Sequence, residues 1–483
     1  MLGKKTKELD KKYFDKDKGD LALELAKVQR LCIEADIPVM ITVDGWESSG
    51  KGYVINELVK DLDTKYYRVS VFDKEVIEDD YSYIRQLWKK IPPQGNFRFL
   101  YRSIYTSLFN DLKSNEEKIQ KRLGLVCNSE KLFTDDGGII LKFFLDIDKD
   151  SLEKNIKDLK EDKYKSFFIT KEDKNQLKDY DEYRNYMGKV LEQTNYEYSP
   201  WEIVNSIDRK EAAKYVIGRS IEIITSKIEE VKAKKEEAKK FKFKGKKISN
   251  SIADLDLTKS VDKETYDLEV EKLQDRARDL AYKLYTEKIP TVIVFEGIDA
   301  AGKGGSIGRL LRKIDPRIYS VNPTSAPSDL EKNHHYLWRF YNNLPEKGKM
   351  AIFDRSWYGR VMVERVEGFA NELEWSRAYD EINKMEEDLV KSGVLLLKYH
   401  LVISKDEQER RFKDREEEKP FKITDEDWRN REKWDQYILA MDDMIQYTST
   451  DYVSWKVISS EDKRYARLEV LKDFIKACEE RLK

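Results

Sequence analysis

The chain has 483 residues, of which 40% are hydrophobic and 38% charged, and its formal net charge is −2. This length predicts two or three domains, and the balanced charge argues against a polyanion-binding surface over the whole chain. No apolar run approaches the roughly 18 residues of a membrane span, and the three cysteines lie far apart. We therefore expect a cytoplasmic protein in a reducing compartment, with no membrane and no nucleic-acid partner.

The sequence contains an internal repeat. Residues 41–52 match residues 293–304, and three further motifs follow in the same order at an offset of 252 to 254 residues. Ordered matches at a nearly constant offset predict two copies of a domain of roughly 230 residues. We expect an N-terminal domain over 1–235, a charged linker over 236–260 and a C-terminal domain over 261–483.

Residues 227–250 form a charge-dense run at the junction of the two copies. Their composition predicts a helix that continues until Gly245. Two interpretations stay open: a solvated helix followed by a linker, or a basic arm that brings a polyanionic substrate to the site.

Both halves read as strands alternating with helices. In the second half, the β-branched run 291–295 predicts a buried strand, followed by glycines and a helix over 306–314. Residues 349–353 and 394–403 predict two more buried strands, with amphipathic helical patterns between and after them. This alternation predicts an α/β fold, in which each half is a parallel sheet covered on both faces by helices.

The second half carries a glycine-rich motif between its first strand and the following helix, Gly297-x4-Gly302-Lys303-Gly304. Such glycines let consecutive N–H groups surround a phosphate, and the helix that starts near Gly305 adds its positive end. Lys303 is the cation expected to follow a transferring phosphoryl group. The motif predicts phosphoryl transfer; a merely tight strand–helix turn is the alternative.

Gly304 stands where phosphate loops have a Ser or Thr that binds magnesium. Asp299, inside the loop, is a hard carboxylate that could replace this Mg²⁺ ligand, unless it only caps the helix. Asp354 ends a predicted strand, where phosphate-loop enzymes place a second metal-binding acid. Arg355 follows it and could clamp phosphate oxygens, although an Asp–Arg pair after a strand is also common on protein surfaces.

A charged segment from residue 406 to 433 combines basic and aromatic side chains around one proline, Pro420. Its members are Arg410, Arg411, Arg415, Lys422, Arg429 and Arg431, interleaved with Phe412, Phe421, Trp428 and Trp434. A solvated helix would explain the charges alone. A mobile lid that brings arginines over phosphates explains the aromatic residues and the proline as well.

The three histidines lack cysteine or carboxylate neighbours at metal-ligand spacing. His334 and His335 lie in a predicted helix over 330–339, and His400 lies in a predicted strand. We expect all three to be packing or surface residues.

Several motifs resemble the type-2 polyphosphate kinases, and the tandem arrangement is similar to the two-domain subclass of polyphosphate:AMP phosphotransferases (class II). The motifs are residues 297–305, 353–361, 422–431 and 447–450, with Trp455 and Asp462-Lys463 following. The resemblance implies two tandem P-loop kinase-like domains with a helical lid. It implies transfer of the terminal phosphoryl group of inorganic polyphosphate to AMP, giving ADP, with Mg²⁺.

The resemblance also assigns residues. Asp299, Lys303, Asp354 and Arg355 match the family's catalytic loop and acidic motif, with Asp299 and Asp354 as the metal ligands. The phosphate- and nucleotide-binding positions are Gly297, Gly302, Gly304, Gly305, Arg411, Arg415, Lys422, Arg429 and Arg431. A phosphorylated Asp354 stays open, although metal binding is its simpler role.

Other functions remain open at this point. Nothing in the residues separates polyphosphate from ATP as the donor, so an ATP-dependent nucleotide kinase is the nearest rival. Polyphosphate-dependent phosphorylation of ADP, GMP or GDP is a second alternative. A non-catalytic polyphosphate- or nucleic-acid-binding protein is the alternative from another class.

The first half has lost most of the charged positions. Asp299 corresponds to Glu47 and Asp354 to Tyr101, and the lid cations have neutral counterparts, whereas Lys51 and Arg102 are kept. A tyrosine with a pKa near 10 cannot replace a carboxylate as a magnesium ligand at neutral pH. We expect a catalytically silent domain that stands where a second subunit would in single-domain relatives, which leaves a homodimer open. A residual polyphosphate-holding role is the alternative.

Overall fold

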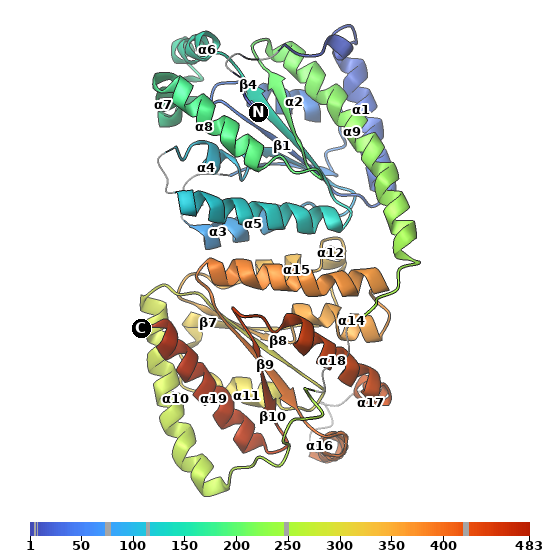
Figure 1. Ribbon diagram of the computed structural model, residues 1–483, viewed down its shortest axis with the longest axis vertical. Coiled ribbons are helices and arrows are strands. Elements are labelled where there is room, and N and C mark those ends of the chain that lie inside the picture. The colour runs from blue at the N-terminus through green and yellow to red at the C-terminus, as the bar shows by residue number, and fades with distance from the viewer. Residues whose placement is uncertain (4–5, 7, 73–78, 113–115, 246–250, 419–424) are drawn as a thin grey trace. The chain divides into compact units, whose positions relative to one another are not determined.

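The computed structural model describes residues 1–3, 6, 8–72, 79–112, 116–245, 251–418 and 425–483 (Figure 1). These residues form two compact units. The first is Met1–Glu236 with Ser328–Trp338, and the second is Glu237–Pro327 with Arg339–Lys483.

The first unit contains a five-stranded parallel sheet with the order β2-β3-β1-β4-β5. Its strands are β1 (Val39–Gly45), β2 (Tyr67–Val71), β3 (Phe97–Tyr101), β4 (Ile139–Asp146) and β5 (Trp201–Asn205). Its helices are η1 (Lys11–Tyr13), α1 (Lys18–Glu34), α2 (Lys51–Val59), α3 (Asp80–Lys89), α4 (Thr106–Phe109), α5 (Glu116–Asp135), α6 (Lys149–Glu161), η3 (Ser166–Phe168), α7 (Lys171–Lys178), α8 (Tyr180–Gln193) and α9 (Arg209–Ala238).

The second sheet repeats this order as β7-β8-β6-β9-β10, again with all strands parallel. Its strands are β6 (Thr291–Gly297), β7 (Tyr319–Pro323), β8 (Met350–Asp354), β9 (Leu395–Val402) and β10 (Trp455–Ser459). The later helices of the chain are α10 (Lys263–Thr286), α11 (Lys303–Leu310), η4 (Pro316–Ile318), α12 (Asp329–Lys332), α13 (Trp338–Asn342), η5 (Trp357–Arg360), α14 (Val363–Val366), α15 (Glu372–Lys391), α16 (Lys405–Glu418), α17 (Asp425–Glu432), α18 (Trp434–Thr448) and α19 (Lys463–Arg481).

The fold class predicted from the sequence is confirmed, because each unit is a parallel sheet with helices on both faces. In the second unit, α10, α11 and α19 cover one face and contribute to a single apolar core with β6, β8 and β9 (Figure 1). Helices α15 and α18 pack together on the other face. Strand β6 is apolar on both faces up to Glu296, as expected for a central parallel strand.

The sheet order places β6 between β8 and β9. The register pairs Phe295 with Asp354, so β8 ends beside the point where β6 leads into the glycine loop. Because parallel strands end at one edge of the sheet, the loop and Asp354 share that edge.

Three predicted boundaries were wrong. Helix α9 ends at Ala238 rather than Gly245, and α11 begins at Lys303, three residues early. The helix expected over 330–339 is interrupted, because α12 ends at Lys332 and His335 Nδ1 accepts from the Leu337 N–H in a turn. At His335 this side-chain contact within a turn competes with the helical hydrogen bonds, which local helix propensity does not predict. Over the described residues, none of the helices is both long and apolar enough to span a bilayer.

Candidate active site at the glycine loop

The loop conformation depends on glycine at two places. Gly297 has φ +139°, and a Cβ there would lie 2.3 Å from the backbone oxygen of Leu401. Gly302 has φ +103° and is the N-cap of α11, with no side-chain cap bond. Asp299 therefore does not cap this helix, and its carboxylate makes other contacts.

Lys303 is held over the loop. Its Nζ donates to the backbone oxygens of Gly297 at 2.6 Å and Ile298 at 3.3 Å. Burial, and then the nearby Arg355 guanidinium, lower the pKa of Lys303. The ammonium group thus has neutral carbonyl partners, which a phosphate oxygen could replace with a gain in charge pairing.

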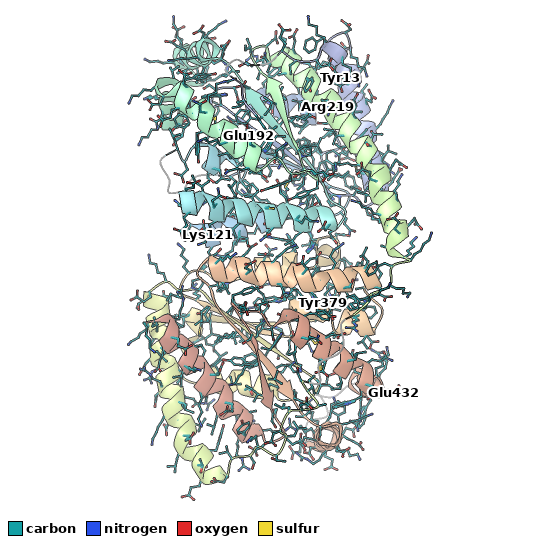
Figure 2. All side chains as sticks on the ribbon, in the orientation of Figure 1. Tyr13, Lys121, Glu192, Arg219, Tyr379 and Glu432 are labelled. Carbon is teal, nitrogen blue, oxygen red and sulfur yellow. The ribbon has the colours of Figure 1, made fainter. Side chains whose placement is uncertain are left out.

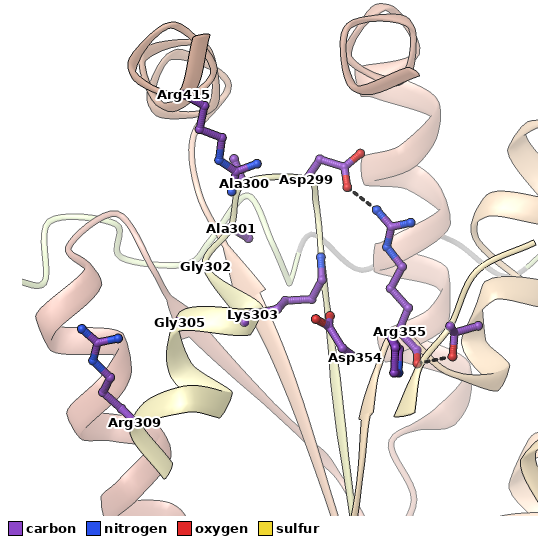
Figure 3. A pocket seen from close by; sticks show the side chains of 13 residues that line it. Asp299, Ala300, Ala301, Gly302, Lys303, Gly305, Arg309, Asp354, Arg355 and Arg415 are labelled. Carbon is purple, nitrogen blue, oxygen red and sulfur yellow. Dashed lines mark hydrogen bonds and ion pairs between the residues drawn. The ribbon is translucent and has the colours of Figure 1, made fainter. Parts of the chain in front are cut away.

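Asp299 and Arg355 form an ion pair across the site (Figure 3). Asn430 of α17 donates to the second carboxylate oxygen of Asp299 at 3.2 Å. Burial would raise the pKa of Asp299, but the charges of Arg355 and Lys303 outweigh it and keep the pKa below its usual value. The Asp299 carboxylate is therefore ionised at neutral pH.

Asp354, at the end of β8, faces the same cavity as the loop (Figure 3). This cavity has a volume of about 550 Å³. Its lining consists of Asp299, Ala300, Ala301, Gly302, Lys303, Gly304, Gly305, Arg309, Pro323, Thr324, Asp354, Arg355 and Arg415. The structure thus brings the four predicted catalytic residues together with three of the four predicted glycines; the fourth, Gly297, supplies a carbonyl to Lys303.

The predicted lid cations are placed differently from one another. Arg415, on α16, lines the cavity. Arg411 instead supports the loop from within, because its guanidinium donates to the backbone oxygens of Ala300, Ser460 and Glu461 and to Glu407. Four of its five N–H groups donate to these partners and it is not among the cavity-lining residues, so a contact of Arg411 with phosphate stays a prediction.

The remaining lid positions predicted to bind phosphate are Arg431, Arg429 and Lys422. Arg431 donates to Lys405 O, Gln408 and Glu409, and so ties α17 to α16. Arg429 is exposed and is not among the residues that line the cavity. Lys422 lies outside the described residues.

Four residues of the site were missed by sequence reasoning. Arg309 and Thr324 line the cavity, Asn430 binds Asp299, and Glu296 lies buried beside the loop. Glu296 accepts a hydrogen bond from Ser356 Oγ at 2.8 Å, yet burial raises its pKa to about 7. A polar residue ending a buried strand was the available signal for Glu296; Arg309 has no comparable signal.

The family model for polyphosphate kinase 2 matches residues 8–236 and again 260–483. The chain belongs to the polyphosphate kinase 2 family. The two matches agree with the two sheets of identical strand order.

Whole-chain relatives of this family are available for comparison. The chain is 35% identical over 481 residues to a polyphosphate:AMP phosphotransferase of Pseudomonas aeruginosa, covering 98% of this chain and 97% of the relative. The crystal structure of a protein from the same species, described as a polyphosphate kinase 2, superposes with a TM-score of 0.82 at 32% identity, covering 98% and 97% of the two chains. An ADP-polyphosphate phosphotransferase of Rhizobium meliloti is 38% identical over 208 residues, 43% of this chain and 73% of the relative.

The first polyphosphate kinase 2 unit has the same loop geometry with different chemistry. Lys51 Nζ donates to the backbone oxygens of Trp46 at 2.6 Å and Gly45 at 3.3 Å, as Lys303 does in the second unit. Arg102 pairs with Glu47 at 3.1 Å, which repeats the pair of Arg355 with Asp299. The scaffold of the site is therefore preserved in both copies.

The first loop is covered by its own helix α7. Gln176 accepts from the Glu47 N–H at 2.8 Å, and Asp173 accepts from Ser48 Oγ at 2.5 Å. Both α7 side chains are buried. A phosphate at this loop would lose one N–H donor and meet a buried carboxylate, which disfavours anion binding.

The second loop presents two hard oxygen ligands to one cavity, Asp299 and Asp354. Within the described ranges, no cluster of three or more His, Cys, Asp or Glu could hold a metal on its own. One or two carboxylates that share an ion with substrate phosphates and water is the arrangement typical of Mg²⁺. The donor set thus fits a divalent ion bound together with its substrate.

Proposed function

We propose that the chain transfers the terminal phosphoryl group of inorganic polyphosphate to AMP and releases ADP. The observation that carries this proposal is the cavity of the second unit, which gathers Lys303, Arg355 and Arg415 beside two carboxylates. The names of its whole-chain relatives support the choice of donor and acceptor.

The reaction requires little covalent chemistry from the protein. Phosphoryl transfer proceeds in line through a metaphosphate-like group, so catalysis consists of positioning and charge neutralisation. Lys303 would exchange its two carbonyl partners for oxygens of the transferred group. Arg355 uses one amino group for Asp299 and keeps the rest of its guanidinium in the cavity, while Arg415 approaches from α16.

Asp299 and Asp354 would hold Mg²⁺. A divalent ion is the usual requirement of phosphotransferases, and when bound it would neutralise the charge that develops between donor and acceptor oxygens. Asp354 as a metal ligand explains why the first unit, with Tyr101 at this position, would be inactive.

We assign catalysis to a C-terminal domain over 261–483 and a silent, architectural role to 1–235, joined by the segment 236–260. The covered loop of the first unit supports this division, because Asp173 and Gln176 already occupy it. A homodimer, a cytoplasmic location and the absence of nucleic-acid and membrane partners stay predictions from the sequence.

The decisive experiment incubates the purified chain with AMP, polyphosphate and Mg²⁺ in the absence of ATP. Anion-exchange chromatography should show an ADP peak. A parallel reaction replaces polyphosphate with ATP: ADP in this second reaction alone would overturn polyphosphate as the donor. Replacing AMP with ADP or GMP in the first reaction then ranks the acceptors.

A further inference from the structure

Several described residues between α9 and α10 pack against helices of the second unit. We call residues 242–245 and 251–252 the linker strap. The ring of Phe243 lies 4.9 Å from Trp375, 6.3 Å from Tyr379 and 5.9 Å from Tyr447, between centroids. Its neighbours Phe241, Lys242 and Lys244 are exposed. One aromatic side chain of a charge-rich segment thus enters an aromatic cage formed by α15 and α18.

Polar contacts hold the strap at both ends. Glu372, in the first turn of α15, accepts from the Phe243 N–H at 2.6 Å and from Lys242 Nζ at 2.9 Å. At the far end, Ile252 is 7% exposed and its N–H donates to Asp442 of α18 at 3.0 Å. For residues 227–250 the sequence left open a solvated helix followed by a linker, or a basic arm that brings a polyanionic substrate to the site. The contacts of Phe243 show that this part of the run is packed against the second unit.

The aromatic cage contacts α14 through hydrogen bonds and ring contacts of Arg365. Tyr379 of α15, labelled in Figure 2, accepts from Arg365 Nη1 at 2.9 Å. The same nitrogen donates to Asp443 of α18 at 2.7 Å, and the guanidinium lies 4.2 Å from the Trp375 ring centre. Arg365 belongs to α14, so the strap, α15, α18 and α14 form one packed group.

Glu367, which follows α14, connects this packed group to the junction of α17 and α18. Glu367 accepts from Lys433 Nζ at 2.6 Å and from Tyr437 at 3.1 Å. Lys433 is the single residue between α17 and α18. Helix α17 in turn carries Asn430, which binds Asp299. Contacts thus run without a break from Phe243 to the glycine loop.

The first unit provides an internal comparison. Its own N-terminal residues lie on α8, where Arg184 Nε donates to Gly3 O at 2.8 Å and Leu2 lies 3.7 Å from the Cβ position of Gly188. Gly188 corresponds to Asp442 at the repeat offset of 254 residues. In both units, residues before the first long helix therefore contact the corresponding helix, α8 in the first unit and α18 in the second.

The aromatic cage, however, has no counterpart in the first copy. The offset that aligns Glu130 with Glu386 places Ile119 and Leu123 opposite Trp375 and Tyr379. The aromatic cage and the charged cavity thus occur in the same unit, the second.

We propose that Phe243 is a positioning residue for phosphoryl transfer, which holds α17 and Asn430 over the loop through the cage and α14. The kinetic part of this inference rests on the proposed function. Loss of the ring would leave the cage open on one side and loosen the α14–α18 contacts that hold Lys433.

The test compares Phe243→Ala with Phe241→Ala, an exposed phenylalanine two residues away. We expect Phe243→Ala to lower kcat/KM about 10-fold, because small displacements of positioning groups cost one to two orders of magnitude in rate. Phe241→Ala should match the wild type. Phe243→Tyr should recover most of the rate, since it refills the cage. If Phe243→Ala does not fold, Phe243→Leu, which fills the cage only in part, is compared with Phe241→Leu and should still show a lower rate.

Hydrogen exchange provides a readout that does not require turnover. Amides of residues 425–432 should exchange faster in Phe243→Ala than in Phe241→Ala, while those of β6 and β8 stay unchanged. Equal exchange and equal kinetics for the two variants would overturn the proposal. Wild-type protein that makes no ADP would instead contradict the proposed function, and the exchange data would still test the strap.

Discussion

Lys398 Nζ lies 2.7 Å from Glu386 Oε2, and neither side chain is open to solvent. Lys398 also donates to Tyr358, and Tyr358 and the Trp357 indole donate to Glu386. The pair therefore fixes the turn that follows Asp354 and Arg355. The first unit has the same buried pair, Lys142 with Glu130, although it lacks the acidic residue of the site.

We expect Lys398→Met to destabilise the second unit by about 3–5 kcal/mol, because it leaves Glu386 buried without its cation. Adding Glu386→Gln should recover part of this loss, since the amide still accepts from Trp357 and Tyr358. Urea unfolding followed by tryptophan fluorescence measures both. Lys142→Met is the matched variant in the first unit, and a comparable cost there would mark the pair as structural.

Comparing Lys303→Met with Lys51→Met tests which of the two glycine loops is needed for ADP formation. Both lysines make the same two carbonyl contacts, and Lys51 also lies 3.6 Å from the Glu47 carboxylate, so Lys51→Met removes at least as many interactions from its fold as Lys303→Met does. Lys303→Met should lower kcat by on the order of 100-fold or more, as expected for loss of a transition-state charge partner. Lys51→Met should leave ADP formation close to wild type; an equal loss of turnover would refute the silent first domain.

Asp354→Asn should abolish ADP formation at any accessible Mg²⁺ concentration and leave the circular dichroism spectrum unchanged. The amide keeps the size of the side chain but loses the charge that a divalent ion requires. Tyr101→Phe, at the corresponding position of the first unit, is the control and should remain active. Full activity of Asp354→Asn would remove it from the metal site.

Glu296→Gln should change the pH dependence of stability. Burial raises the folded-state pKa of Glu296 from 4.5 to about 7, so the folded chain binds this proton more tightly than the unfolded chain. The resulting stabilisation is complete below pH 4.5 and is lost as the pH rises through about 7, a change on the order of 3 kcal/mol. Urea unfolding at about pH 5 and about pH 8 should show a smaller decline for Glu296→Gln than for wild type. Parallel declines would contradict the raised pKa.

Arg415→Ala should raise the KM for polyphosphate several-fold with a smaller effect on the KM for AMP. Arg415 reaches the cavity from α16, whereas Arg410 on the same helix is exposed and pairs with Glu407 and Asp414. Arg410→Ala is therefore the control. An unchanged KM for polyphosphate in Arg415→Ala would place the donor chain elsewhere.

The sequence allowed the fold class to be predicted because its signals were local and repeated. An apolar β-branched run such as 291–295 can be buried in few ways, and a strand followed by spaced glycines and a lysine indicates one loop geometry. The repeat then extended the prediction to the other half. Composition alone did not reveal the strap, because one phenylalanine among lysines gives no periodic signal for a cage built from α15 and α18.

The site was predictable where its residues are adjacent in sequence. The loop residues and the Asp354–Arg355 pair follow strand ends, so their meeting at one edge follows from parallel topology. The lid was harder, since helix orientation decides which arginine faces a cavity. Arg411 and Arg415 lie one helical turn apart, yet Arg411 bonds with loop carbonyls and Arg415 lines the cavity.

Gly297 and Gly45 together affect how related sequences should be interpreted. A side chain at either position would collide with the backbone of the neighbouring strand, at 2.3 Å from Leu401 O or Leu145 O. Selection on folding alone is enough to retain both glycines, whether or not a copy still catalyses. A glycine-loop signature alone therefore does not distinguish a catalytic copy from a silent one. We expect the residue at the end of the third strand of each copy, Asp354 or Tyr101, to be the better marker.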